Sequence, residues 1–335
     1  MPPGKTPRYR RLQSSGTPLW PVRSRRVAGT VLSFNGVSKS YGSVKAVDDL
    51  SFAVEAQSVT GLLGPNGAGK STVMKLCLGL ARAREGEIEL FGAAPRTRAF
   101  RSAVRRTGSQ IELPALYDRV SARSNLEIHG AGFGIKRRDP WIGQVLDLVG
   151  LSGRSEDRVK GFSMGMRQRL SLGLAILNRP ELIILDEPVN GLDPSGVVEI
   201  RELIRSLPSG GTTVLVSSHL LDEIERTVDR VLIIRDGKLV TEGAIDEIVS
   251  SGYTLVQVAR REARDAVDVL TAYGMGATAG GGGAVRVDTG GRPPSDVAKA
   301  LADAGIYPTE LRPEHNDLES AFLGLVDDGG ADAQG

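Results

Sequence analysis

A run of small residues around one lysine has the composition of a loop that grips phosphate. It consists of Gly64, Pro65, Asn66, Gly67, Ala68, Gly69, Lys70, Ser71 and Thr72. Backbone N–H groups of such a run can curl around phosphate oxygens, because the glycines add no side chain that would intrude. Lys70 can reach the outer phosphates, and the Ser71 hydroxyl can ligate the magnesium ion that accompanies them. The loop therefore predicts a site for a nucleoside triphosphate and Mg²⁺.

The segments on either side of this loop fit the same prediction. The apolar stretch 59–63 predicts a strand that enters the loop, and 71–78 predicts a helix that leaves it with its N-terminus aimed at the anion. The alternative is a glycine-rich turn with a chance Lys-Ser pair. That alternative does not account for the strand and the helix that flank it.

Two carboxylates follow a second apolar run. Leu182–Leu185 predicts a buried parallel strand, and Asp186 and Glu187 come at its carboxyl end, where ligands bind in open α/β sheets. Asp186 is placed to hold magnesium, directly or through water, and Glu187 to polarise the water that attacks the terminal phosphate. A strand that stops at a solvated acidic turn is the alternative, and the upstream phosphate loop disfavours it.

A serine and a glycine begin a predicted helix between these two elements. Ser163 and Gly165 bring a hydroxyl, a small residue and free backbone N–H groups to one point, although a plain helix cap would look the same. Here the chain resembles the nucleotide-binding subunit of an ABC transporter, which implies that this point faces the γ-phosphate of ATP bound by a second copy. Met164 and Met166 depart from the commonest family form, Leu-Ser-Gly-Gly-Gln. The Ser-x-Gly-Met form resembles the branch of bacterial exporter ATPases associated with antibiotic and drug efflux.

The resemblance also implies roles for three further residues. Asp193, in Asn-Gly-Leu-Asp, is similar to the acidic residue of the loop that crosses between paired domains. His219 follows a predicted strand, 213–216, and resembles the switch histidine that contacts the γ-phosphate and holds Glu187. Tyr41 resembles the aromatic that stacks on adenine, and a tyrosine that packs at a strand end is its alternative. Preference for ATP over GTP follows from the resemblance alone.

One metal-contacting position departs from the family pattern. Most members carry a glutamine there, and aligning Thr107–Pro114 places Glu112 at that position, with Gln110 two residues earlier. A carboxylate can still ligate a hard cation such as Mg²⁺, and we favour Glu112 over Gln110. The segment 116–126 that follows resembles the surface where a membrane subunit docks a short coupling helix.

The composition fits a multidomain protein of the cytoplasmic side. The 335 residues include 42 Lys and Arg, 40 Asp and Glu, and one cysteine, Cys77, which excludes an internal disulfide framework. No run reaches the ~18 apolar residues of a membrane span, so a pore would have to lie on another polypeptide. The resemblance implies that a separate transmembrane permease subunit carries that pore and holds this chain at the cytoplasmic face of the cell membrane. No nucleic-acid partner is expected.

Changes of pattern along the chain predict its organisation. Residues 1–30 hold seven Lys or Arg and no acidic residue, which predicts a disordered basic tail. Residues 31–250 predict an α/β fold with a helical subdomain at about 101–160, and the resemblance implies that this fold is a P-loop NTPase of the ABC ATPase cassette type. Residues 251–328 predict a small α+β accessory domain with strand, helix, strand, helix, strand order, which closes on a helix at 317–326. A flexible tail at 329–335 completes the chain.

These predictions combine into one mechanism. The resemblance implies that two cassettes, as a homodimer or with a second ABC cassette, pack head to tail, and that each ATP is bound by the loop of one and the Ser163 segment of the other. ATP closes the dimer, hydrolysis reopens it, and the permease converts the cycle into export. The alternatives are an importer ATPase subunit, a soluble ABC ATPase acting on ribosomes or DNA, and a nucleotide-binding regulator that barely hydrolyses. The presence of Glu187 argues against the last of these.

Overall fold

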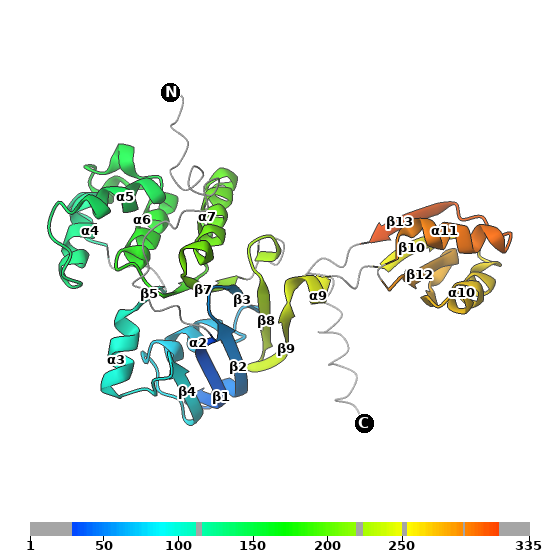
Figure 1. The fold of residues 1–335 in the computed structure, drawn as a ribbon, viewed down its shortest axis with the longest axis horizontal. Helices are drawn as coiled ribbons and strands as arrows, with labels where there is room; N and C mark the ends of the chain where they lie inside the picture. Colours follow the sequence, from blue (N-terminus) through cyan, green and yellow to red (C-terminus); the bar gives the residue numbers. More distant parts are fainter. Residues whose placement is uncertain (1–28, 112–115, 219–223, 250–252, 291, 315–335) are drawn as a thin grey trace. The chain divides into compact units, whose positions relative to one another are not determined.

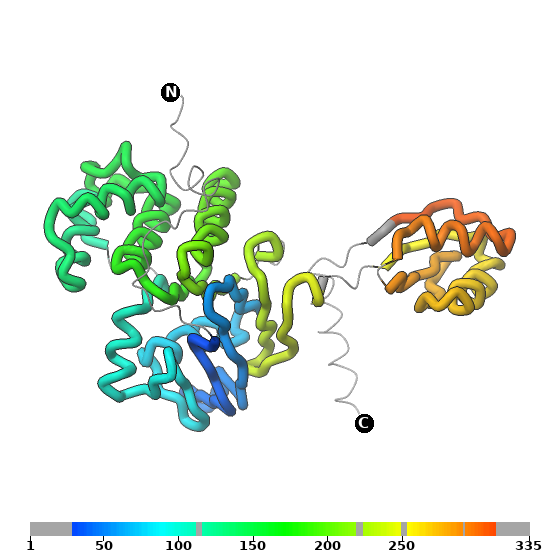
Figure 2. Tube along the Cα trace, viewed as in Figure 1, coloured from blue at the N-terminus to red at the C-terminus, as the bar shows by residue number. Residues whose placement is uncertain are grey.

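The chain forms two compact units, Met1–Glu242 and Gly243–Gly335. The computed structural model describes residues 29–111, 116–218, 224–249, 253–290 and 292–314, which are coloured in Figure 1 and Figure 2. The predicted basic tail, Glu112, His219, the closing helix at 317–326 and the tail at 329–335 lie wholly or almost wholly outside the described residues. Within the described ranges, no helix is both long enough and apolar enough to cross a bilayer.

A six-stranded sheet forms the centre of the first unit. Its order is β5 (Thr107–Gln110), β6 (Leu182–Asp186), β7 (Thr213–Ser218), β3 (Val59–Leu63), β8 (Arg230–Arg235) and β9 (Lys238–Ala244). The strands from β5 to β8 are parallel, and β3 and β7 are buried along their whole length. Such continuous apolar strands are typical of a parallel sheet covered on both faces.

A tight turn joins β8 to β9. Strands β8 and β9 are neighbours, and the turn between them consists of Asp236 (φ 49°) and Gly237 (φ 79°). Positive φ at both central residues is the geometry of a two-residue type I′ hairpin turn, and it explains the Asp-Gly pair there.

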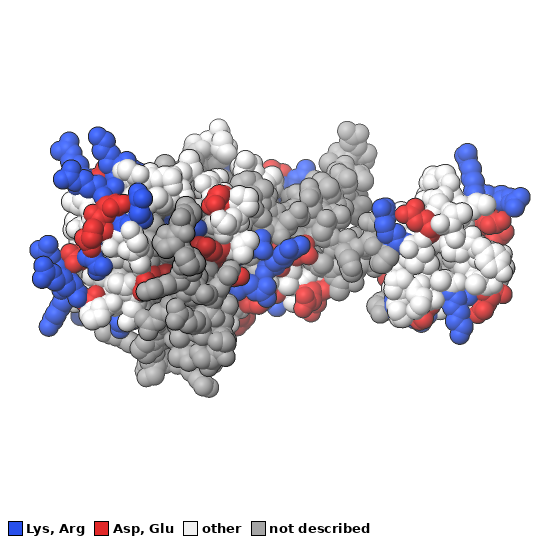
Figure 3. Space-filling view, turned by 90° about the horizontal axis from the view of Figure 1, so that it is seen from above, with Lys and Arg blue, Asp and Glu red and all other residues white. Residues whose placement is uncertain are grey.

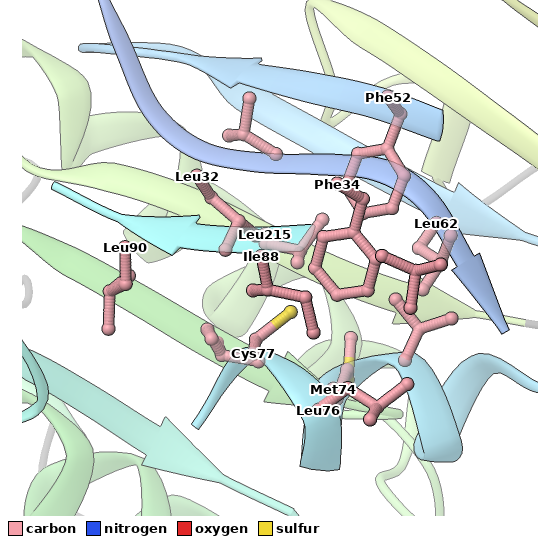
Figure 4. Close-up of a cluster of buried hydrophobic side chains, with 14 of the residues drawn as sticks. Leu32, Phe34, Phe52, Leu62, Met74, Leu76, Cys77, Ile88, Leu90 and Leu215 are labelled. Carbon is pink, nitrogen blue, oxygen red and sulfur yellow. The ribbon is translucent and has the colours of Figure 1, made fainter. Parts of the chain in front are cut away.

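A second sheet is antiparallel and packs against α2 (Lys70–Cys77). Its order is β2 (Val44–Glu55), β1 (Thr30–Tyr41) and β4 (Glu85–Leu90). Figure 4 shows the core that α2 forms between the two sheets, in which Met74 and Leu76 lie among residues of both. The rings of Phe34 and Phe52 stack with centroids 4.6 Å apart. This core fixes the helix that follows the phosphate loop.

Helices cover the remaining parts of the first unit. They are α3 (Arg98–Arg105), α4 (Ala122–Ala131), α5 (Pro140–Leu148), α6 (Met164–Ile176) and α7 (Pro194–Ser206), with 3-10 turns at Ser152–Arg154, Val159–Gly161 and Pro208–Gly210. The predicted helical stretch at about 101–160 is wrong at its beginning, because Thr107–Gln110 is β5 of the main sheet. A Cβ on Gly108 would lie 1.9 Å from the carbonyl oxygen of Ala175, so β5 packs directly on α6.

The second unit has its own core and sheet. After α9 (Ile245–Val249) come β10 (Tyr253–Gln257), α10 (Ala263–Ala272), β11 (Gly276–Ala279), a 3-10 turn (Gly281–Gly283), β12 (Ala284–Asp288), α11 (Pro294–Asp303) and β13 (Glu310–Glu314). The antiparallel sheet has the order β11-β12-β10-β13. This β-α-β-β-α-β arrangement is that of a ferredoxin-like fold.

The sequence missed one strand of this unit. Strand β11 consists of Gly-Ala-Thr-Ala and is largely exposed at a sheet edge, so it lacks the apolar alternation that would reveal it. Side chains of α10, α11 and the sheet form a separate buried cluster that includes Val256, Leu270, Val285 and Leu301. Lys, Arg, Asp and Glu side chains lie around this unit in Figure 3 (right), as on a solvated surface.

Candidate functional site

The loop of residues 64–72 connects β3 to α2 and lies against backbone on both sides. A Cβ on Gly64 would lie 2.2 Å from the carbonyl oxygen of Ile234, and a Cβ on Gly69 would lie 2.3 Å from that of Ala46. A Cβ on Gly67 would meet nothing within 4 Å, although φ there is 87°. Gly64 and Gly69 are therefore required by close approach, and Gly67 by backbone conformation. The result is a cradle of small residues at a helix N-terminus, which fits phosphate.

Lys70 is buried inside this loop, with only 6% of its surface exposed. Its Nζ donates to the carbonyl oxygens of Gly64 at 2.6 Å and Pro65 at 3.1 Å, and lies 3.9 Å from Glu187 Oε1. Burial lowers the pKa of Lys70, and the nearby Glu187 and Asp186 carboxylates partly oppose this. A phosphate oxygen would give this buried ammonium the close counter-charge that carbonyl groups cannot provide.

Asp186 connects the loop to the central sheet. Its Oδ2 accepts a hydrogen bond from Ser71 Oγ at 2.7 Å, and its Oδ1 accepts one from Ser217 Oγ at 2.5 Å. Ser217 lies directly beside Asp186 in the parallel register of β6 and β7. Hydroxyl and carboxylate oxygens are the ligands that Mg²⁺ prefers, so Ser71 and Asp186 fit such an ion.

Glu187 follows immediately and is held through its backbone. Its φ is 51°. Its N–H donates to Ser217 Oγ at 3.1 Å, and its carbonyl oxygen accepts from Gln168 Nε2 at 3.1 Å. The side chain of Glu187 is about a quarter exposed (23%), so solvent can reach it. A carboxylate beside a phosphate site and open to water can orient and polarise a water molecule.

Sequence reasoning missed Ser217 and Gln168 as site residues. Ser217 had a signal, since it directly follows an apolar run, as Asp186 does, and the carboxyl ends of neighbouring parallel strands lie at one sheet edge. Gln168 had none, because only the packing of α6 against the end of β6 brings its amide to Glu187.

The N-terminus of α6 and the beginning of α7 form a neighbouring patch. Ser163 Oγ accepts from the N–H of Met166 at 3.3 Å, and a Cβ on Gly165 would lie 3.1 Å from Leu192. Asp193 caps α7 by accepting from Gly196 N at 3.3 Å, and Ser195 Oγ donates to it at 2.6 Å, which lowers the pKa of Asp193. The first N–H groups of a helix have no carbonyl partner within the helix, so the N-terminus of α6 can receive an anion.

The other predicted site residues have different outcomes. Tyr41 ends β1, is 49% exposed, and has Lys39 Nζ 4.8 Å from its ring centroid. Its ring is thus open to a stacking partner. Gln110 is buried at the end of β5, and its Oε1 accepts no hydrogen bond within the described part of the chain. Glu112 and His219, as stated, fall outside the described residues.

Comparisons with known proteins agree with this geometry. Residues 47–190 match the family model described as "ABC transporter". The bacitracin transport ATP-binding protein BcrA of Bacillus licheniformis is 43% identical over 220 residues, which cover 65% of this chain and 71% of that protein. The daunorubicin resistance ATP-binding protein DrrA3 of Streptomyces coeruleorubidus is 34% identical over 320 residues, which cover 90% of this chain and 98% of that protein.

A solved cassette shows the same fold. It is described as a dimeric structure of a post-hydrolysis state of the ATP-binding cassette MJ0796, bound to ADP and Pi. The match has a TM-score of 0.58 at 22% identity, and covers 64% of this chain and 98% of that one. The α/β cassette fold predicted from the sequence is therefore confirmed.

Proposed function

Because this chain belongs to the ATP-binding subunits of ABC transporters, we propose that it is the ATP-hydrolysing motor of an exporter whose pore is a separate membrane subunit. One observation supports the assignment most strongly. A buried lysine, a serine hydroxyl and two carboxylates from separate parts of the sequence meet at the mouth of one glycine-lined loop. The similarity to bacitracin transport and daunorubicin resistance proteins favours an antibiotic or another drug as cargo.

The described residues divide the chemistry between them. The N–H groups of residues 64–72 and the ammonium of Lys70 bind the phosphates of ATP. Ser71 and Asp186 would hold magnesium, which when bound neutralises the phosphate oxygens. Glu187 orients the attacking water and draws its proton away as the water approaches the γ-phosphate. Glu112 is a further candidate metal ligand, and His219 a candidate contact to the γ-phosphate.

The site is completed by a second copy. ABC cassettes form dimers, and we assign Ser163 and Gly165 of one copy to the γ-phosphate of ATP held by the other. Asp193 then lies in the loop that crosses between the two, and Tyr41 stacks on adenine. The chain works at the cytoplasmic face of the membrane through its contact with the permease.

The variant Glu187→Gln tests this function. It keeps the shape of the side chain and removes the charge that polarises water, so we expect ATP to bind with unchanged affinity, turnover to fall by ~10²–10⁴-fold, and ATP to trap a dimer in size-exclusion chromatography. Hydrolysis by the variant at the parental rate would show that Glu187 does not polarise the attacking water. Glu89→Gln, at an exposed position of β4 in the antiparallel sheet, is a control for loss of one carboxylate.

A further inference from the structure

The backbone of Glu187 adopts a conformation that residues with a side chain seldom adopt. Its φ of 51° lies in the left-handed region, where the Cβ of an L-residue crowds the following carbonyl group. Pro188 comes next and restricts the backbone of Glu187 further. A conformation of this kind persists only where neighbouring groups hold it.

Two side chains from different elements hold the peptide groups on either side of Glu187. Ser217 Oγ, at the end of β7, accepts from its N–H, and Gln168 Nε2, on α6, donates to its carbonyl oxygen; both distances are 3.1 Å. Ser217 is completely buried and its hydroxyl proton goes to Asp186, so its lone pairs face the N–H of Glu187. Ser217 on one side and Gln168 on the other therefore hold the backbone from which the Glu187 side chain extends.

Gln168 also lies on α6, whose N-terminus, with Ser163 and Gly165, is called the Ser163 patch below. Ser163 caps α6, and Gln168 follows five residues later, about 7.5 Å along the axis of an α-helix. Helix α6 is packed along its buried side and against β5, so a displacement of its N-terminus moves Gln168 with it. The amide of Gln168 is then the connection from the Ser163 patch to Glu187.

We propose that Gln168 and Ser217 are positioning residues for Glu187, and that Gln168 makes the position of Glu187 depend on what the N-terminus of α6 binds. The inference rests on the proposed function, in which Ser163 contacts the nucleotide of the second copy and Glu187 serves the nucleotide of its own. Helix α6 then links the two composite sites. A γ-phosphate bound at Ser163 in one site holds α6 in place, and Gln168 on the same helix then holds Glu187 in place in the other site.

The first test separates binding from turnover. Gln168→Met keeps an unbranched side chain of similar length and helix propensity but has no donor. We expect its affinity for ATP to match that of the parent, and its kcat to fall by ~10–100-fold, since small misplacements of a reacting group cost this much. Asn178→Ala is the matched control, because it removes an amide that donates to the carbonyl oxygens of Arg105 and Thr107 near the other end of α6. A parental kcat in Gln168→Met, or an equal loss in both variants, would overturn the positioning role.

A double-mutant cycle tests the link between the sites. Ser163→Ala and Gln168→Met remove groups that do not contact one another, so independent effects on kcat should multiply. If the effect of binding at Ser163 reaches Glu187 through Gln168, the substitution Ser163→Ala will lower kcat several-fold less in the Gln168→Met background than in the parent. Simple multiplication of the two effects would refute the link.

Two controls separate this inference from the function on which it rests. Ser217→Ala releases the other side of Glu187 without altering α6, and should also lower kcat. Because it also removes a donor to Asp186, the fall in kcat counts for the positioning role only if it persists at saturating Mg²⁺. If Glu187→Gln hydrolyses at the parental rate, the proposed function fails. If Glu187→Gln is inactive while Gln168→Met and Ser217→Ala both keep the parental kcat, only the positioning role fails.

Discussion

Replacing Lys70 with alanine should separate nucleotide binding from stability. The Nζ of Lys70 lies among the loop carbonyls, where a phosphate oxygen can approach it closely. A unit charge pair ~4 Å apart gains about 4 kcal/mol at an effective dielectric constant of ~20. Because 1.4 kcal/mol corresponds to a tenfold change in affinity, the full pair is worth about 10³-fold in Kd. Two existing hydrogen bonds to the loop must be shared or given up, so we expect a loss of ~10²–10³-fold.

The stability of the nucleotide-free protein should respond differently. Burial lowers the pKa of Lys70, so the folded state disfavours the charged ammonium that the unfolded chain carries at neutral pH. The variant Lys70→Ala should then unfold at the same temperature as the parent or at a higher one. Its affinity for ATP should nevertheless fall by the amount given above.

Calorimetric titration with a non-hydrolysable ATP analogue measures the affinity, and thermal unfolding without nucleotide measures the stability. Lys75→Ala removes a cation from the same helix, outside the loop, and should bind as the parent does. An unchanged Kd for Lys70→Ala would refute the assignment of the loop. A large fall in the Tm of the nucleotide-free variant would show that the lysine is structural.

Three further predictions follow from packing. Gly64→Ala should abolish ATP binding because its Cβ would lie 2.2 Å from the oxygen of Ile234. Gly67→Ala would be strained by its φ of 87° but would meet nothing within 4 Å, so it should raise the Kd less than Gly64→Ala does. Cys77 is completely buried, which raises the pKa of its thiol, so iodoacetamide at pH 8 should label it only under denaturing conditions; rapid labelling of native protein would contradict this. Leu270→Ala removes a buried side chain from the core of the second unit. It should lower the free energy of unfolding of this unit by about 2–5 kcal/mol, measured by urea titration, and leave the ATPase rate unchanged. A fall in the ATPase rate would show that the two units are coupled.

The sequence predicted those parts of the site that are continuous along the chain. The loop of residues 64–72 and the pair Asp186–Glu187 each depend on a short segment between a strand and a neighbouring turn or helix, so residue order alone carries the signal. Ser217 and Gln168 act through a strand register and a helix packing that bring distant segments together. No local pattern records the contact from Gln168 to Glu187.

The fold was predictable to a similar degree. Buried parallel strands such as β6 and β7 stand out as continuous apolar runs. The antiparallel strands β1 and β2 are less evident, because their register shifts at several irregularities that interrupt the alternation of buried and exposed residues. Strand β5 was assigned to the helical stretch because its four residues, Thr-Gly-Ser-Gln, are short and polar, and only the pairing with β6 identifies it.

The dependence of ATPase activity on protein concentration tests the central proposal most directly. If each hydrolytic centre takes its phosphate loop from one copy and its Ser163 segment from another, activity per molecule should be low in dilute solution and rise to a plateau as dimers form. Mass photometry on the same samples should show dimers appearing over the same range of concentration. Constant activity per molecule down to concentrations at which only monomers are present would contradict the account.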